Sequence, residues 1–283
     1  MQIIDGKEIS KKVKNEVKIE SEKLTTLGTK PTLAVILVGE DKASMTYVAS
    51  KEKACKACSM GSFVYRLPKD TTKDELLKLI KKLNSDDEVH GILVQLPLPK
   101  QIDTYEILLA IDPAKDVDGF HPINVGRLLL GIDGFVPCTP LGIMRLLKEY
   151  GIEVSGKEVC VVGRSSIVGK PMANLMLNAN ATPTITHSRT KNLKEVTKRA
   201  DIVVVAIGKP GFLTADMVKD GAVVVDVGIN RLESGKLVGD VDFEAVSKKC
   251  SFITPVPGGV GPMTIAMLLS NTLKAAKDFH QKR

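Results

Sequence analysis

The sequence of 283 residues contains no uncharged apolar run of about eighteen residues, the length that a membrane-spanning helix needs. Its first residues, MQIIDGKEIS, have neither a basic flank nor an apolar core followed by small residues, so they do not read as a secretory signal. Because both features are missing, the sequence predicts a protein that stays in the cytoplasm.

Cysteine is also scarce, with five residues and no framework spacing, which indicates free thiols in a reducing compartment. Cys55 and Cys58 form a C-x-x-C inside a predicted helix from Ser44 to Met60, and no second Cys pair or His pair completes a zinc site. Two small buried apolar side chains are the favoured interpretation, with a redox pair as the alternative. No metal site is predicted.

Aromatic residues make up only 4% of the chain, and no basic run is interleaved with them. The formal charge of +7 comes from lysines that are spread along the sequence and mixed with acids, as in KKVKNEVKIESEK, a pattern typical of a solvated helix face. An anionic small molecule or cofactor explains this excess as well as nucleic acid does. The alternative, a regulatory or nucleic-acid-binding module, predicts salt-sensitive binding to DNA.

Apolar β-branched runs alternate with helical segments in both halves of the chain. The runs LAVILVG, FVYRL and GILVQL belong to the first half, and EVCVVG, PTITH, DIVVVAIG and AVVVDVG to the second. Strands that are apolar throughout belong to parallel sheets covered by helices on both faces. The fold class predicted is therefore α/β, with right-handed crossovers.

A Gly-, Pro- and Asp-rich stretch from Asp116 to Pro140 marks the predicted boundary between two domains. Thr139 is predicted to cap a helix that has Pro140 at its first position and ends before Gly151. A last amphipathic helix, 262–283, is expected to pack back on an N-terminal three-layer domain of residues 1–120. Residues 139–261 then form a Rossmann-type domain.

The turn in EVCVVGRSSIVGKPMANLML is predicted to bind a dinucleotide. Gly163 permits a sharp exit from the strand and Gly169 permits close packing at the start of the helix, where backbone amides would face a pyrophosphate. An NAD site normally has an acidic residue after the next strand, but here that strand is followed by His187–Thr190. Arg164 and Ser188–Arg189 are suited to a 2′-phosphate instead, so NADP is the predicted cofactor.

Polar residues in the first half indicate a second site. Tyr47 and Lys51 are four residues apart and share a helix face. Gln95 ends an apolar strand at the carboxyl edge, where ligands of α/β proteins collect. Asp116 and Asp118 lie in a turn-rich segment, where a turn-forming role is the plain alternative.

At these residues the sequence resembles the bifunctional methylenetetrahydrofolate dehydrogenase/methenyltetrahydrofolate cyclohydrolase (FolD) family. The motifs are YVASK, GILVQLPLP, DVDGFHP, PCTPLG, GRSSIVGKP, THSRT and PVPGGVGPMT, and they span nearly the whole chain. The resemblance implies oxidation of 5,10-methylenetetrahydrofolate with NADP⁺, followed by hydrolysis of the methenyl cation to 10-formyltetrahydrofolate. It also suggests a homodimer.

The resemblance assigns roles residue by residue. Lys51 corresponds to the catalytic lysine, Tyr47 stacks on or orients the folate, Gln95 adjusts Lys51, and Asp118 holds the pterin ring. The full set of implied folate contacts is Tyr47, Lys51, Gln95, Leu96, Asp118, Pro262 and Thr264. The full set of implied NADP contacts is Gly163, Arg164, Ser165, Ile167, Val168, Ser188, Arg189, Gly208, Ile229 and Gly259.

The chemistry fits those residue types. Hydride transfer needs orientation more than acid or base, whereas hydrolysis needs a base for water. A lysine whose pKa is lowered from about 10.4 by burial and by a cationic substrate can be that base. Lys51 is therefore predicted to matter most for hydrolysis. A shikimate dehydrogenase-like enzyme is the alternative on the same scaffold, but it does not account for VQLPLP or PGGVGPMT.

Overall fold

The computed structural model describes residues 1–282, which form two compact units. The six-stranded unit comprises Met1–Lys11 and Pro137–Thr264, and the three-stranded unit comprises Lys12–Val136 and the chain from Ile265 on. Residues 1–11 were expected in the N-terminal domain, but they belong to the six-stranded unit. They group with the six-stranded unit because β1 (Gln2–Ile3) pairs in parallel with β11 (Phe252–Ile253).

The three-stranded unit contains a parallel sheet of order β3-β2-β4. Its strands are β2 (Thr32–Val38), β3 (Gly61–Leu67) and β4 (Gly91–Val94). Its helices are α2 (Lys42–Ala57), α3 (Lys73–Asn84), α4 (Thr104–Ala110) and α5 (Pro122–Leu130), with parts of α1 (Gly6–Thr26) and α10 (Val260–Gln281).

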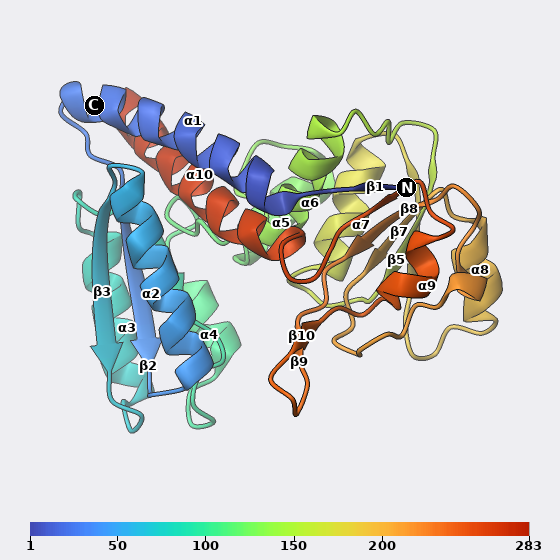
Figure 1. Ribbon diagram of the computed structural model, residues 1–283. Coiled ribbons are helices and arrows are strands. Elements are labelled where there is room, and N and C mark those ends of the chain that lie inside the picture. The colour runs from blue at the N-terminus through green and yellow to red at the C-terminus, as the bar shows by residue number, and fades with distance from the viewer. Residues whose placement is uncertain (283) are drawn as a thin grey trace. The chain divides into compact units, whose positions relative to one another are not determined.

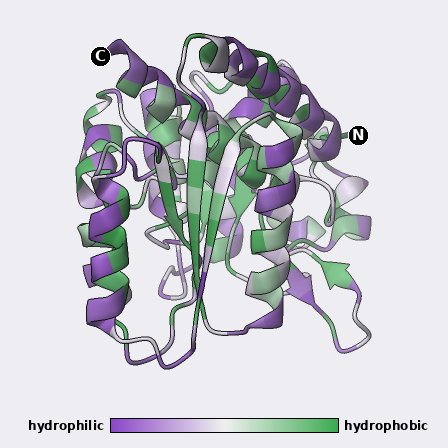
Figure 2. Ribbon diagram, turned by 90° about the vertical axis from the view of Figure 1, so that its left-hand side faces the viewer, coloured by the Kyte–Doolittle hydropathy of each residue, from purple (hydrophilic) through white to green (hydrophobic). Residues whose placement is uncertain are grey.

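Strand β2 is buried along its whole length, as its apolar sequence predicts. Side chains alternate between the faces of a strand, and Ala34, Ile36 and Val38 join one core with Leu76 and Ile80 of α3. Leu33, Val35 and Leu37 therefore point to the opposite face, so both faces are covered. Figure 2 shows the largely hydrophobic strands between helices, and these helices carry hydrophilic residues.

The six-stranded unit holds a parallel sheet of order β1-β11-β8-β7-β5-β6. Its remaining strands are β5 (Glu158–Val162), β6 (Thr182–Thr186), β7 (Ile202–Val205) and β8 (Val223–Asp226), with a small hairpin of β9 (Asn230–Arg231) and β10 (Leu237–Val238). Its helical elements are α6 (Cys138–Glu149), α7 (Gly169–Asn178), α8 (Leu193–Arg199), the short 3₁₀ turn η1 (Ala215–Met217) and α9 (Phe243–Ser247) (Figure 1).

This strand order places a topological switch point between β5 and β7. The chain goes from β5 outward to β6, then returns to the other side of β5 for β7, β8 and β11. In doubly wound sheets, ligands bind at the carboxyl ends of the strands where the order reverses. The loops that begin at Gly163, after β5, and at Ala206, after β7, lie at this position.

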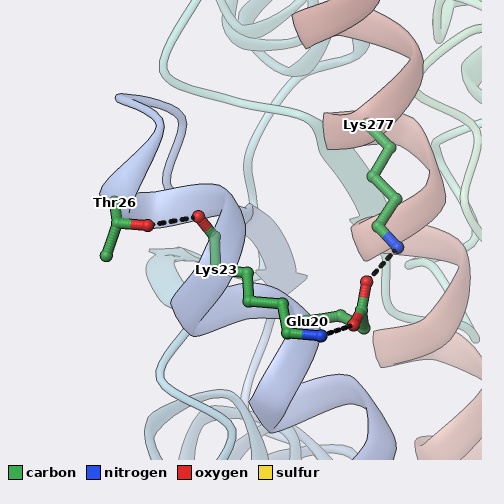
Figure 3. A network of polar contacts seen from close by, with 4 residues as sticks. All are labelled: Glu20, Lys23, Thr26 and Lys277. Atoms are coloured by element: carbon green, nitrogen blue, oxygen red, sulfur yellow. Dashed lines mark hydrogen bonds and ion pairs between the residues drawn. The ribbon is translucent and has the colours of Figure 1, made fainter.

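Helices α1 and α10 lie side by side in the three-stranded unit. Figure 3 shows Glu20 of α1 accepting hydrogen bonds from Lys23 and from Lys277 of α10, both at 2.8 Å. These two contacts, with that of Lys23 the larger, hold the pKa of the Glu20 carboxyl at about 2. Further along, Asn271 donates to the carbonyls of Val117 and Val136. The expected packing of the C-terminal helix on the N-terminal domain is therefore confirmed.

Three expected helix boundaries were wrong. Helix α6 begins at Cys138, so its N-cap position is Pro137, which has no side-chain oxygen. Thr139 lies inside the first turn, and its hydroxyl bonds with the Thr264 hydroxyl at 2.9 Å. Helix α10 begins at Val260, and Pro262 is tolerated in its first turn, where a backbone N–H has no helical partner. Helix α2 ends at Ala57, and the positive φ of Ser59 (57°) then turns the chain into β3.

Three further features of residues 1–282 bear on function. No helix among them is long and apolar enough to cross a membrane. All five cysteines are buried, and burial raises the pKa of the Cys55 thiol to about 12, so this thiol stays protonated at neutral pH. No group of three or more His, Cys, Asp or Glu in this range is arranged to hold a metal ion.

Candidate active site

Helix α2 carries Tyr47 and Lys51, the first two predicted folate-site residues. The Asp41 carboxylate caps the helix by accepting from the Ser44 N–H at 2.8 Å, which fixes where the helix starts. Tyr47 is 46% exposed, whereas Lys51, one turn later, is half-buried. The helix therefore presents an accessible ring and a partly shielded amine.

The Lys51 amine contacts Gln95, a residue 44 positions away in the sequence. Lys51 Nζ donates to Gln95 Oε1 at 2.8 Å, and Gln95 Nε2 donates to the Leu96 carbonyl at 2.7 Å. Gln95 follows β4 directly, and its backbone N–H donates to the Ile36 carbonyl at 2.8 Å. Both ends of the amide are thus fixed at the carboxyl edge of the sheet, and Lys51 is held there with it.

Asp118 is half-buried in a turn that is shaped by Asp116. The Asp116 carboxylate, 2% exposed, accepts from the N–H groups of Phe120 (3.2 Å) and His121 (2.8 Å) and from Asn124 Nδ2 (2.9 Å). Burial raises the pKa of the Asp116 carboxyl from 3.8 to about 6, although these hydrogen bonds act in the opposite direction. The two acids of DVDG therefore differ: Asp116 builds the turn and Asp118 lies on it.

The predicted residues Pro262 and Thr264 lie in the first turns of α10 and belong to the six-stranded unit. The Pro262 carbonyl accepts from the Ser10 hydroxyl at 3.0 Å, and Thr264 is held by Thr139. Gly259, just before this helix, donates its N–H to the Pro255 carbonyl at 2.8 Å. The glycine-rich strip, residues 257–261, is therefore held by the hydrogen bond of Gly259 and by that of Pro262 at its end.

The turn after β5 brings backbone segments too close for any side chain. A Cβ on Gly163, whose φ is +132°, would lie 2.4 Å from the Ala206 carbonyl oxygen, and one on Gly169 would lie 2.2 Å from the Gly163 oxygen. Such distances exclude residues larger than glycine at both positions. The backbone of this turn is therefore tightly packed at the start of α7, where the helix dipole has its positive end.

Ser165, Arg164, Ile167 and Val168 complete this turn. Ser165 Oγ accepts from the N–H groups of Val168 (3.2 Å) and Gly169 (3.3 Å), so the hydroxyl serves as the cap that the start of α7 otherwise lacks. Arg164 and Ile167 are exposed. An exposed guanidinium near a helix N-terminus suits an anionic phosphate.

The loop after β6 presents Ser188 and Arg189 to solvent. Thr190 Oγ1 accepts from the His187 N–H at 2.8 Å, and His187 Nδ1 accepts from the Arg189 N–H at 3.1 Å. Both bonds close the loop on itself and leave the side chains of Ser188 and Arg189 outside. Residues 187–190 include no acidic side chain to accept from a ribose 2′-hydroxyl, so the loop suits a 2′-phosphate better.

Gly208 and Ile229, the last predicted cofactor contacts, lie in the loops that follow β7 and β8. Gly208 has a φ of +67°, and Ile229 is 49% exposed despite its apolar side chain. Both loops are hydrogen-bonded to Asp240, a buried residue that the sequence motifs did not single out. The only sequence signal for it is an acid within the apolar context LVGDV.

Comparison with known families covers nearly all of the chain. Residues 4–118 match the catalytic domain of tetrahydrofolate dehydrogenase/cyclohydrolase, and residues 137–280 match its NAD(P)-binding domain. The chain belongs to this family. Among curated relatives, the bifunctional protein FolD of Campylobacter fetus is 70% identical over 278 residues, which is 98% of each chain.

Solved structures agree with this family assignment. The FolD methylenetetrahydrofolate dehydrogenase/cyclohydrolase of Campylobacter jejuni has a TM-score of 0.97 at 59% identity, covering 98% of this chain and 99% of that one. The FolD of Trypanosoma brucei, solved with NADP cofactor and an inhibitor, has a TM-score of 0.93 at 41% identity, covering 98% and 97%.

Shikimate dehydrogenase, the alternative that the sequence left open, is a remote neighbour. That enzyme from Thermus thermophilus reaches a TM-score of 0.54 at 16% identity over 87% of this chain and 99% of its own. A likeness at this level concerns the fold alone. The family that the motifs indicated is therefore confirmed, and the alternative is not supported.

Proposed function

We propose that Lys51, Tyr47, Gln95 and Asp118 handle the folate and that the turns around Gly163, Ser188, Gly208 and Ile229 bind NADP. The family gives the overall reaction: the chain is a bifunctional enzyme that oxidises 5,10-methylenetetrahydrofolate with NADP⁺ and hydrolyses the product to 10-formyltetrahydrofolate. The observation that carries the residue assignment is the bond from Lys51 Nζ to Gln95 Oε1.

NADP⁺, when bound, supplies the hydride acceptor for the first reaction. The chain contributes orientation in this step, because the nitrogen lone pairs of the substrate stabilise the developing methenyl cation without an external acid or base. Tyr47, being half-exposed, offers a flat face for the folate rings. Asp118 provides a carboxylate to accept hydrogen bonds from the pterin.

Hydrolysis of the methenyl cation requires a general base, and we assign this role to Lys51. Water must lose a proton as it attacks the methenyl carbon, and a ring nitrogen must gain one as the ring opens. A neutral Lys51 amine donates one N–H to Gln95 Oε1 and keeps its lone pair for the proton of that water. The positive charge of the substrate favours this neutral form by repulsion.

The test of this role compares both activities in Lys51→Met. We expect hydrolysis to fall at least about a hundredfold, the usual effect of losing a general base, and hydride transfer to fall less. NADPH formation and decay of the methenyl absorbance measure the two steps separately. Lys53→Met, on an exposed position of the same helix, is the matched control. Full hydrolytic activity in Lys51→Met would contradict the assignment.

Selection of NADP is assigned to Arg164 with Ser188. Replacing Arg164 by Ala should lower kcat/KM for NADP⁺ about ten- to a hundredfold and leave that for NAD⁺ nearly unchanged, because only NADP carries the 2′-phosphate. Arg199→Ala, an exposed cation of the same unit, controls for net charge. Equal kcat/KM for NAD⁺ and NADP⁺ in the unmodified enzyme would refute the assignment.

We further propose a cytoplasmic homodimer. Strand β3 forms an edge of its sheet, and Phe63 on it is 39% exposed, so a second copy could cover this edge. Sedimentation at micromolar concentration should give twice the chain mass of 30.6 kDa, and a monomer would rule this proposal out. Cell fractionation tests the compartment.

A further inference from the structure

Asp240 is a fully buried acid in the segment between β10 and α9, with 0% of its surface exposed. Its carboxylate accepts four hydrogen bonds. Oδ2 accepts from the N–H groups of Ile207 (2.7 Å) and Gly208 (2.9 Å), and Oδ1 accepts from the Lys209 N–H (2.8 Å) and Asn230 Nδ2 (2.9 Å). A carboxylate has about four acceptor positions, so all of them are in use.

Three of these donors belong to Ile207–Lys209, which follow β7 beside the switch point at the carboxyl edge of the six-stranded sheet. The fourth is Asn230, the first residue of β9, which directly follows Ile229 and the loop after β8. The approach is so close that a Cβ on Gly228 would lie 2.3 Å from Asp240 Oδ1. A single carboxylate therefore binds the backbone of the loop after β7 and the side chain of Asn230, and it packs closely against Gly228 in the loop after β8.

A second buried acid, Asp226 at the end of β8, holds Asp240 itself in place. Its carboxylate accepts from the N–H groups of Gly228 (2.9 Å), Asp240 (2.9 Å) and Val241 (3.0 Å). A Cβ on Gly239 would lie 1.8 Å from Asp226 Oδ2, so glycine is required there too. The two acids form a chain of contacts that leaves the Asp240 carboxylate little freedom to move.

We propose that Asp240 is a positioning residue for NADP. Buried and fully bonded, its carboxylate has no acceptor left for the cofactor, so it acts by shaping the loops that carry Gly208 and Ile229. The inference rests on the proposed function, which assigns these two residues to NADP. Loss of the carboxylate loosens the loops assigned to the cofactor and leaves Lys51 and Gln95, which lie in the three-stranded unit, as they are.

The main test is Asp240→Asn, in which an amide NH₂ faces backbone N–H donors and cannot accept from them. We expect the KM for NADP⁺ and the Kd from direct titration of the free enzyme to rise at least about tenfold. Hydrolysis of methenyltetrahydrofolate, assayed without NADP⁺, should keep its KM within about twofold. Asp242→Asn is the matched control, because its exposed carboxylate caps α9 and contacts neither loop.

Equal losses in hydrolysis and NADP⁺ binding would overturn the inference, because they would indicate a general structural role. An unchanged Kd for NADP⁺ would also overturn it. If Asp240→Asn does not fold, Asn230→Ala removes one of the four donors and should raise the Kd for NADP⁺ about threefold, and no rise there refutes the inference. Failure of the proposed function is distinct: the unmodified enzyme would then not bind NADP⁺.

Discussion

At the scale of single residues, buried carboxylates do much of the shaping of this protein. Asp116 ties the turn that carries Asp118, and Asp240 ties the loops that carry Gly208 and Ile229. Each one satisfies backbone N–H groups that no strand or helix can pair. A buried polar group left without a partner costs about 1–3 kcal/mol, so these acids allow irregular loops to be rigid.

The Asp116 carboxyl should give the stability of the protein a measurable pH dependence. Its pKa rises from 3.8 to about 6 on folding because burial disfavours the charged form. The folded chain then holds the proton more tightly than the unfolded chain does. The stabilising contribution is therefore complete below pH 3.8 and is lost as the pH rises through about 6. At about 1.4 kcal/mol per pKa unit, the loss is roughly 3 kcal/mol.

Asp116→Asn removes this titration and tests the prediction. The free energy of unfolding of the wild type, minus that of the variant, should fall by about 2 kcal/mol between pH 4 and pH 7, as measured by urea unfolding, because pH 4 already lies above the unfolded pKa. The substitution is thus expected to harm the protein less at neutral pH than in acid. A difference that stays constant or grows with pH would contradict the prediction.

At the scale of elements, the start of α1 supports the glycine-rich strip before α10. The Asp5 carboxylate caps α1 through the N–H groups of Lys7 (2.8 Å) and Glu8 (3.1 Å), and the Lys7 N–H also donates to the Gly258 carbonyl at 3.1 Å. A Cβ on Gly6 would lie only 1.7 Å from the Gly259 carbonyl oxygen. Helix and strip are therefore in backbone contact at Gly6.

Gly6→Ala should displace this strip. We expect a loss of about 1–3 kcal/mol in the free energy of unfolding, the usual cost of overpacking, together with a lower kcat/KM for the dehydrogenase. Chemical unfolding and steady-state kinetics measure the two effects. Gly126→Ala is the matched control, because a Cβ at this site inside α5 meets nothing within 4 Å and should stabilise by up to about 1 kcal/mol. Equal effects of the two substitutions would show that the contact at Gly6 is unimportant.

At the scale of the whole molecule, two helices belong to both units. Residues Gly6–Lys11 of α1 and Val260–Thr264 of α10 lie in the six-stranded unit, and the rest of each helix lies in the three-stranded unit. A helix propagates cooperatively once it has formed, so loss of one unit frays an element on which the other depends. The units are therefore expected to unfold together.

Calorimetry tests this expectation. The enzyme should show one transition, with equal calorimetric and van't Hoff enthalpies, and NADP⁺ should shift it as a whole. At about 100 times its Kd the cofactor adds about 2.7 kcal/mol to the free energy of unfolding. Two separate transitions, of which NADP⁺ moves only one, would show that the units unfold independently.

Much of this protein is determined by the sequence alone. Apolar runs such as that of β2 predict buried parallel strands, because hydrophobic pattern and strand period are local properties. The i, i+4 spacing of Tyr47 and Lys51 predicts a shared helix face for the same reason. The missing acid after β6 indicates NADP by itself, since cofactor recognition there depends on a few consecutive residues.

Only the tertiary structure decided which polar groups meet. Gln95 and Lys51 are 44 residues apart, and Asp240 and Ile207 are 33 apart. Thr139 bonds with Thr264, 125 residues away, and does not cap the helix as its sequence context predicts. Helix and strand patterns describe how a segment folds on itself. The partner of a buried carboxylate or amide depends on which loops the sheet order brings to one edge, and a local pattern contains no record of that order.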